Sequence, residues 1–191
     1  MPKFKNKRYL CWIPLFIFSC FSKGTKIGNE APELAPMRWW NREIPSLHSL
    51  KSKVVFIRWW TDQCQFCEAS ADALNEWHQE LADSGLVVLG VYHPKPAPRI
   101  LEDNEVYDYI REKNFTFPIA EDAQWTNLTK YRTENELSEF TSVSFLLDKK
   151  GIIRYIHPGG EYHKEYKDGH DECVRQFHVI DSLIRVLLKE K

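Results

Sequence analysis

The stretch Lys53–Cys67, KVVFIRWWTDQCQFC, decides the fold of this chain. Its first eight residues are β-branched, aromatic or otherwise strand-compatible, which is typical of a buried central strand. Over 68–82 the composition changes to helix formers, with apolar side chains recurring at helical spacing on one face. Two cysteines, Cys64 and Cys67, therefore lie between a buried strand and the start of a helix.

Strand and helix patterns alternate along the rest of the chain. They predict strands at 86–92, 117–120, 143–148 and 152–157, and helices at 102–113, 123–131 and 171–189. Lys149-Lys150-Gly151 separates the last two strands, which favours a tight antiparallel hairpin. The order β-α-β-α-β-α-β-β-α predicts an α/β fold with a central mixed sheet and helices on both faces.

The composition is that of one globular domain. The chain has 191 residues, 43% of them hydrophobic, with seven Trp, eight Tyr and eleven Phe, which excludes intrinsic disorder. Lys and Arg number 26 against 27 Asp and Glu, a net charge of −1, so we expect no nucleic-acid partner.

The N-terminal segment resembles a bacterial export signal. Cations at 3–8 precede an apolar stretch at 9–18, too short to span a bilayer. The residues Ile17-Phe18-Ser19-Cys20 resemble a lipobox, so we expect a signal peptide over 1–19, cleaved before a lipidated Cys20. Plain secretion and an uncleaved N-terminal signal anchor are the alternatives. A polar, flexible tether is expected at 20–30 and the folded domain at 31–191. This predicts a lipid-anchored protein of the bacterial cell envelope that faces the periplasm.

The CxxC pair carries the predicted chemistry. At a helix start, unpaired N–H groups and the helix dipole favour an anion, so the Cys64 thiol is expected to form a thiolate readily. Two intervening residues let both sulfurs meet, which makes Cys64 the predicted nucleophile and Cys67 the resolving thiol. Two other interpretations are open: a zinc site, which would need histidines because no second CxxC exists, and a purely structural disulfide.

The chain from about Ala31 to Lys189 resembles the TlpA/ResA-type branch of the thioredoxin superfamily, and is similar to the thioredoxin-like domains of NHL-repeat proteins. The segments that carry this resemblance are APEL at 31–34, WWN at 39–41, KVVFIRWWTDQCQFC at 53–67, GVYHPK at 90–95 and FLLDKKG at 145–151. The resemblance implies a thioredoxin fold and a membrane-anchored thiol–disulfide oxidoreductase without a cofactor. Its partners would be thiol- or disulfide-bearing envelope proteins, as in cytochrome c or copper-site maturation, and a membrane redox partner.

Three positions depart from the family pattern. Gln63 stands where relatives have Trp before the first cysteine, and Ser142 stands where a cis-proline normally faces the CxxC pair. We expect a trans peptide bond at Ser142, because a cis bond before a non-proline residue is costly. Arg58 replaces an acidic or amide residue. It either lies beneath the active site and stabilises a thiolate, or faces the other side of the sheet.

Three further residues are candidates for supporting roles. Glu68 is either a proton acceptor or a solvated carboxylate in the first helical turn. His93 either tunes proton transfer or is a loop histidine without function. Trp60 and Trp59 are both expected in the hydrophobic core, where one of them can form the floor of the substrate-binding groove.

The C-terminal part contains a cysteine among histidines. His170 and Cys173 share a helix face, whereas His178 is poorly aligned with Cys173. Surface histidines and a semi-buried thiol are favoured over a metal site, so no metal is predicted.

Two other functions remain as alternatives. One is a Sco-like copper-delivery protein, in which both thiols and a histidine would bind Cu(I), although that group has CxxxC spacing. The other is a peroxiredoxin-type peroxidase, for which Thr61 and an arginine would be needed. The direction of electron flow does not follow from the sequence.

Overall fold

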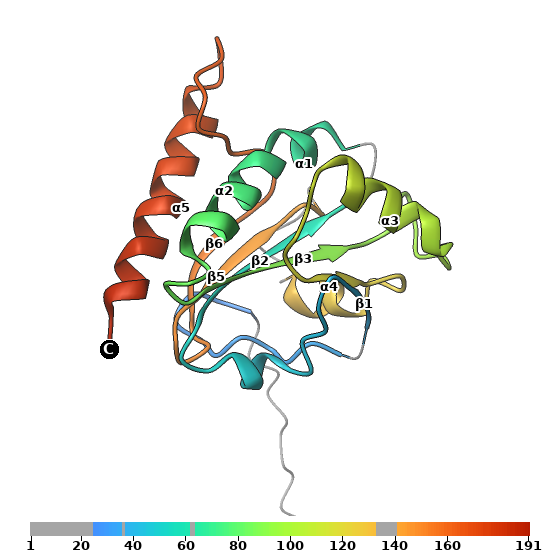
Figure 1. Ribbon diagram of the computed structural model, residues 1–191, viewed down its shortest axis with the longest axis horizontal. Coiled ribbons are helices and arrows are strands. Elements are labelled where there is room, and N and C mark those ends of the chain that lie inside the picture. The colour runs from blue at the N-terminus through green and yellow to red at the C-terminus, as the bar shows by residue number, and fades with distance from the viewer. Residues whose placement is uncertain (1–24, 36, 62–63, 133–140) are drawn as a thin grey trace, which may run out of the picture.

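The computed structural model describes residues 25–35, 37–61, 64–132 and 141–191. They form a six-stranded mixed sheet in the order β1-β4-β3-β2-β5-β6 with helices on both faces (Figure 1). The strands are β1 Arg38–Trp40, β2 Val54–Trp60, β3 Leu86–Tyr92, β4 Ile119–Glu121, β5 Ser144–Leu147 and β6 Ile153–His157. The helices are α1 Gln65–Ala69, α2 Ala71–Leu81, α3 Asp103–Glu112, α4 Thr126–Tyr131 and α5 Asp171–Lys189, with a 3-10 helix, η1, at Leu47–Leu50. The predicted α/β fold is confirmed.

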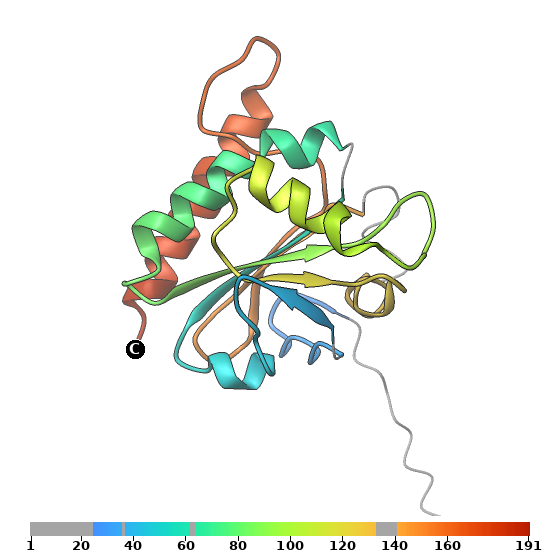
Figure 2. The ribbon, with the colours of Figure 1, turned by 45° about the vertical axis from the view of Figure 1, so that its right-hand side comes forward.

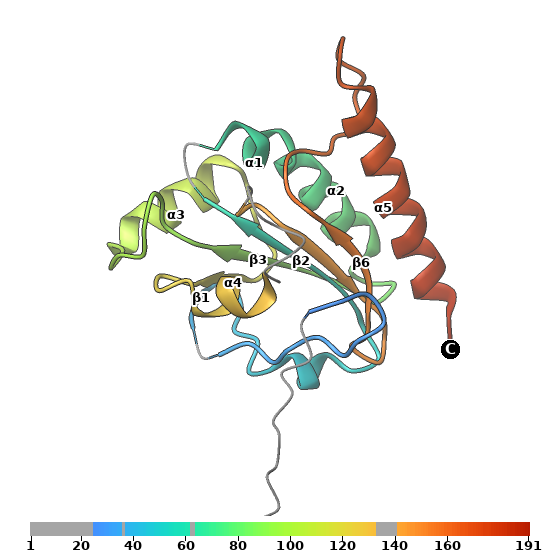
Figure 3. The same ribbon diagram turned by 180° about the vertical axis from the view of Figure 1, so that it is seen from behind.

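The central strand is β2, as its composition predicts. It pairs in parallel with β3 and antiparallel with β5, and all seven of its side chains are buried. Alternate residues of β2 point to opposite faces of the sheet. Phe56 and Trp60 join a core beneath α2, α3 and α5, whereas Ile57 and Trp59 join a second core beneath α4 and η1. Figures 2 and 3 show the helices on the two faces of the sheet, turned by 45° and by 180° from the view of Figure 1.

Gly90 of β3 is required by close packing rather than by backbone conformation. A Cβ atom at this position would lie 2.5 Å from Ile119 Cδ1 and 2.9 Å from Trp60 Nε1. The absent side chain makes room for the Trp60 ring, which stacks on Tyr109 with centroids 4.5 Å apart. Trp60 is therefore a core residue.

Two local features differ from the sequence predictions. The first predicted helix begins at Gln65 and is divided at Ser70 into α1 and α2. Ser70 Oγ donates to the carbonyl of Phe66, four residues back, a contact that competes with regular helix geometry. The short strand β1, absent from the predicted order, pairs antiparallel with β4 at the edge of the sheet.

The described part of the expected tether, 25–30, is hydrogen-bonded to the folded domain. Gly28 N donates to Ile153 O at 2.8 Å, and Ile153 N donates to Asn29 O at 2.9 Å. Thr25 is buried and its hydroxyl donates to Lys130 O. These long-range hydrogen bonds attach 25–30 to the domain, and composition alone does not reveal them. The predicted signal peptide, 1–19, and Cys20 lie outside the described residues.

Candidate redox site

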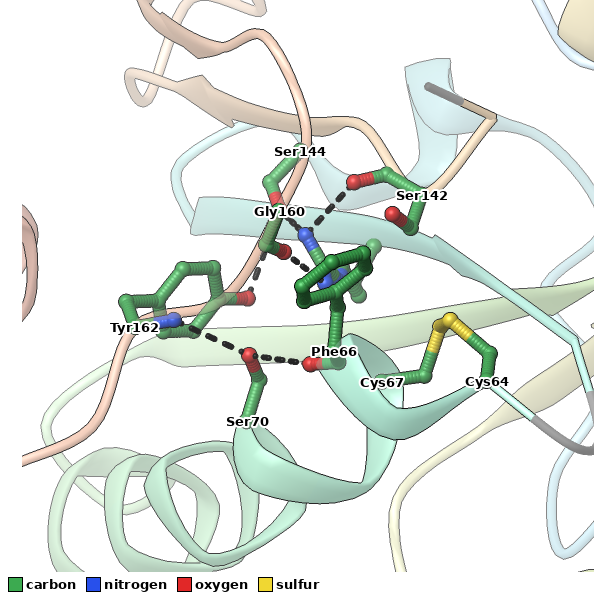
Figure 4. Close-up of a disulfide and its surroundings, with 9 residues drawn as sticks. Cys64, Phe66, Cys67, Ser70, Ser142, Ser144, Gly160 and Tyr162 are labelled. Atoms are coloured by element: carbon green, nitrogen blue, oxygen red, sulfur yellow. Dashed lines mark hydrogen bonds between the residues drawn. A yellow bond between two sulfur atoms is a disulfide. The ribbon is translucent and has the colours of Figure 1, made fainter. Parts of the chain in front are cut away.

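The two cysteines of the CxxC pair form a disulfide at the start of α1 (Figure 4). Their Cα atoms are 5.2 Å apart. Cys64 is the N-cap residue of α1, and its carbonyl accepts hydrogen bonds from the N–H groups of Cys67 and Glu68. The first turn of a helix presents N–H groups and the positive end of the peptide dipoles, which stabilise a thiolate at this position.

The two sulfurs differ in their access to solvent. Cys64 is half-buried, whereas Cys67 is only 4% exposed and packs in the core that contains Phe56 and Trp60. An external thiol therefore meets Cys64 first, and Cys67 is placed to attack from within the protein. This arrangement fits the roles that the sequence predicts for the two cysteines.

An open groove borders the disulfide. Its lining includes Thr61, Cys64, Phe66, Lys95, Pro96 and Arg99. Lys95 and Arg99 add positive charge, although Arg99 is paired with Glu105 at 2.8 Å. The groove opens beside Cys64 and has a cationic edge.

Arg58 lies on the face of the sheet that carries α1 and α2, as the first of its two alternatives requires. Its side chain is completely buried, and its guanidinium lies 5.0 Å from the centroid of the Tyr162 ring. Arg58 Nη1 donates to Ser142 O at 2.7 Å, and Nη2 donates to Gly160 O at 2.8 Å. Burial lowers the pKa of Arg58 below its ordinary value, yet arginine stays protonated in proteins.

A hydrogen-bond chain joins Arg58 to the active-site helix. Arg58 Nη1 also contacts Ser144 Oγ at 3.2 Å, and Ser144 Oγ lies 3.3 Å from the Tyr162 hydroxyl. Tyr162 N donates to Ser70 Oγ at 3.1 Å, and Ser70 Oγ donates to Phe66 O at 3.0 Å (Figure 4). A fixed positive charge is thus tied to the helix that carries Cys67.

Ser142 occupies the loop before β5, and its peptide bond is trans. Cis peptide bonds in the described residues are confined to Lys95–Pro96. The Ser142 carbonyl is bound by Arg58, and the neighbouring Val143 carbonyl accepts from Trp59 N at 2.9 Å. Arg58 therefore holds the loop at Ser142, the position at which the resembling family is expected to have a cis-proline.

Two other candidates lie apart from the reacting sulfurs. Glu68 is exposed in the first turn of α1, which favours the solvated carboxylate over the proton acceptor. His93 is completely buried, with its ring against Trp125 at 5.7 Å and both ring nitrogens without a hydrogen bond among the described residues. Gln63 lies outside the described residues.

His93 and His157 make the stability of the fold pH-dependent. Burial is the main cause that lowers the pKa of each to about 3, and the Arg58 charge acts in the same direction. Below the ordinary pKa near 6.5, the unfolded chain binds protons that the folded chain excludes until about pH 3. Their contribution is therefore present above pH 6.5 and is lost as the pH falls toward 3.

We expect the free energy of unfolding to decrease by about 2 kcal/mol for each of these histidines between pH 7 and pH 5. Urea unfolding followed by tryptophan fluorescence at both pH values measures the change. In a chain carrying His93→Gln and His157→Gln, the difference between the two pH values should shrink, whatever the absolute stability. An unchanged difference would contradict the assignment.

Comparisons with known proteins identify the family of this chain. The AhpC/TSA family model matches residues 27–156. Protein DipZ of Mycobacterium bovis is 32% identical over 84% of this chain, which spans about a fifth (21%) of the length of DipZ. Thiol-disulfide oxidoreductase ResA of Bacillus anthracis is 26% identical, with 76% of each chain covered.

Structural comparison supports the same fold. A putative thiol:disulfide interchange protein DsbE from Chlorobium tepidum superimposes with a TM-score of 0.67 over 86% of this chain and 99% of its own. At 17% sequence identity, this likeness shows the thioredoxin-like fold alone.

Proposed function

The chain belongs to the AhpC/TSA family and carries the CxxC pair of a thiol–disulfide oxidoreductase, and from this we propose that it exchanges electrons with cysteines of other envelope proteins while anchored to a membrane. The observation that carries the chemistry is the bridge between half-buried Cys64 and buried Cys67 at the start of a helix. A substrate thiolate attacks Cys64 of the disulfide, or the Cys64 thiolate attacks a substrate disulfide, and Cys67 resolves the mixed disulfide.

The reaction balances without a cofactor. In the reducing direction, Cys64 forms a bond to one substrate sulfur while the other leaves as a thiolate. Cys67 then attacks Cys64, which releases the second substrate thiolate and leaves the Cys64–Cys67 disulfide. Two electrons pass from the protein to the substrate, and a membrane redox partner returns them. The reverse sequence oxidises a substrate, and the reduction potential decides the direction.

The groove suggests the kind of peptide that is accepted. Its cationic edge at Lys95 and Arg99 favours a substrate segment with acidic residues next to the reacting cysteine. Envelope proteins whose cysteines must be reduced before haem or copper insertion are candidate partners, as in the resembling family.

The anchor is inferred from the lipobox-like sequence that ends at Cys20. No helix within the described residues is both long and apolar enough to cross a membrane. Only 21–24 separate Cys20 from Thr25, which is hydrogen-bonded to the domain, and five residue steps span at most about 18 Å. A lipid on Cys20 would therefore hold the redox domain at the membrane surface, where membrane-bound partners are reached.

The two alternative functions gain less support from the site. Copper delivery would need a histidine nitrogen at the two thiols, whereas the potential metal ligands that gather in the described part of the chain lie elsewhere, between Glu161 and Cys173. A peroxidase would need an arginine free to bind peroxide, whereas Arg58 is buried and donates to the loop carbonyls of Ser142 and Gly160.

We expect the full chain, produced in a bacterium and labelled with radioactive palmitate, to incorporate the label and sediment with membranes. Cys20→Ala should abolish labelling, whereas the matched variant Cys11→Ala, in the predicted signal peptide, should keep it. Equal labelling of the two variants would reject the lipid anchor.

The exchange chemistry is tested separately by removing the Cys64 thiol, which we expect to abolish turnover.

A further inference from the structure

A second cluster of reactive side chains lies in the segment between β6 and the first turn of α5. It comprises Glu161, His163, His170 and Cys173, whose ligand atoms all lie within 4.8 Å of one another. Glu161 and His163 come from the segment that follows β6, and Cys173 comes from the first turn of α5. Figure 2 shows this segment projecting beyond the sheet and returning to α5. Helical spacing alone places only His170 and Cys173 together.

The distances within the cluster suit one shared ion. Glu161 Oε1 is 2.7 Å from His170 Nδ1, 4.0 Å from His163 Nε2 and 3.5 Å from Cys173 Sγ. The two imidazole nitrogens are 3.4 Å apart. In a tetrahedral zinc site with bond lengths of about 2.0 to 2.3 Å, neighbouring ligand atoms are separated by roughly 3.3 to 3.8 Å. These four separations, from 2.7 to 4.0 Å, bracket this range, and the two pairs between Cys173 Sγ and the imidazole nitrogens lie within 4.8 Å.

The orientation of His163 is the second observation that indicates a ligand. Its Nδ1 lies 2.7 Å from the carbonyl oxygen of Glu165, which can only accept a hydrogen bond. Nδ1 therefore carries the proton, and Nε2 directs its lone pair at the other three side chains. Metal-binding histidines are typically oriented in this way, by a hydrogen bond from the second ring nitrogen.

We propose that Glu161 Oε1, His163 Nε2, His170 Nδ1 and Cys173 Sγ bind one Zn²⁺ ion. One thiolate, two imidazoles and one carboxylate are all common zinc ligands, and four protein ligands make a closed, structural site. Glu161 and His163 side chains are 13% and 8% exposed, while His170, at 38%, lies at the solvent edge and leaves a path for the ion. Binding converts the Cys173 thiol to a thiolate and releases its proton to water, with no change of oxidation state.

The zinc ion would stabilise the hydrogen bonds around the redox site without contacting the two redox cysteines. Glu161 stands between Gly160, whose carbonyl binds Arg58, and Tyr162, whose N–H binds Ser70. Fixing Glu161 to α5 therefore also holds its neighbours Gly160 and Tyr162, which bind Arg58 and Ser70 of the hydrogen-bond chain that reaches α1. Coordination also removes Cys173 from thiol exchange, so that the Cys64–Cys67 pair reacts with substrates without a competing third thiol.

The test uses the full chain with the Cys64–Cys67 disulfide formed, so that these two sulfurs cannot bind the ion. We expect one equivalent of Zn²⁺ per chain by elemental analysis and a higher melting temperature with zinc than after chelation. Co²⁺ in place of zinc should give the intense visible absorption of a tetrahedral ion and a thiolate-to-cobalt band in the near ultraviolet.

Variants separate coordination from a general loss of structure. Cys173→Ser should remove the thiolate-to-cobalt band. His170→Ala removes a ligand and should weaken zinc binding by at least the roughly 10- to 100-fold that loss of an outer-shell partner costs. His178→Ala, an exposed histidine on the same helix, is the matched control and should bind zinc like the parent chain. The melting temperature of each chelated variant shows whether it still folds.

Three outcomes would overturn the proposal. The first is the absence of stoichiometric zinc on the oxidised chain, which would leave the His170–Glu161 contact as an ordinary ion pair. The second is zinc binding that is unchanged in Cys173→Ser and His170→Ala. The third is a weak six-coordinate cobalt spectrum. None of these outcomes bears on thiol–disulfide exchange, because the CxxC pair stays oxidised throughout.

Discussion

Replacing Cys64 with serine is expected to reduce thiol–disulfide exchange to the uncatalysed background. The measurement is the turbidity assay of insulin reduction by dithiothreitol, with the parent chain accelerating the reaction. Serine can neither form a disulfide nor ionise near neutral pH, and Cys67 is too deeply buried, at 4% exposure, to replace Cys64 as the entry point. Residual acceleration by Cys64→Ser would reject Cys64 as the nucleophile.

Cys67→Ser is expected to fail in a different way. Cys64 can still attack a substrate disulfide, but no second thiol resolves the product, so a mixed disulfide should accumulate. Mass spectrometry after non-reducing purification identifies the trapped partner. Cys11→Ser, which removes a cysteine from the predicted signal peptide, is the matched control and should keep full activity without trapping. Trapping by Cys64→Ser instead would reverse the two roles.

Replacing Arg58 with methionine is expected to lower the free energy of unfolding by about 2 to 4 kcal/mol. Methionine fills much of the same volume but leaves the carbonyls of Ser142 and Gly160 and the Ser144 hydroxyl without their donor. Relief of the desolvation cost of the buried charge offsets part of this loss. The unpaired acceptors dominate, because each buried group left without a partner costs about 1 to 3 kcal/mol.

Urea unfolding followed by tryptophan fluorescence measures this effect. Arg111→Met, on the exposed side of α3, is the matched control and should change stability by less than about 0.5 kcal/mol. Arg58→Lys keeps the charge but not the forked geometry that reaches the two carbonyls, so we expect only partial recovery. A loss below about 1 kcal/mol in Arg58→Met would contradict this account of the buried network.

The same variants test whether Arg58 acts on the redox chemistry. Its positive charge lies on the face of the sheet that carries α1, and removing it should raise the pKa of the Cys64 thiol. Thiolate absorbance near 240 nm, titrated against pH in the reduced chain, measures that pKa. Arg58→Lys should restore it toward the parent value, which a purely structural role would not require. An unchanged pKa in Arg58→Met would leave Arg58 with a structural role alone.

The predicted fold was correct because its signals are local. The run VVFIRWW is buried along its whole length in β2, and the composition change after Cys67 marks the helical stretch that follows. The CxxC pair was recognisable for the same reason, since its meaning depends on a strand before it and a helix after it. Even the trans bond at Ser142 followed from the residue type.

Three features were not predicted from the sequence because they depend on contacts between segments that are distant in the chain. The break at Ser70 coincides with a hydrogen bond from Tyr162 N, 92 residues later in the chain. Residues 25–30 read as a linker, yet their backbone groups pair with β6. The edge strand β1 is only three residues long, and its pairing with β4 is what defines it.

Residue type and spacing alone established the α/β order, the central strand and the redox pair, since hydrophobic periodicity and the CxxC spacing act over a few residues. Which face of the sheet Arg58 occupies, what binds its guanidinium, and the meeting of Glu161 and His163 with Cys173 were decided only by the folded chain. These features depend on how a loop returns across the molecule. That path is set by the packing of the whole core, which no local pattern encodes.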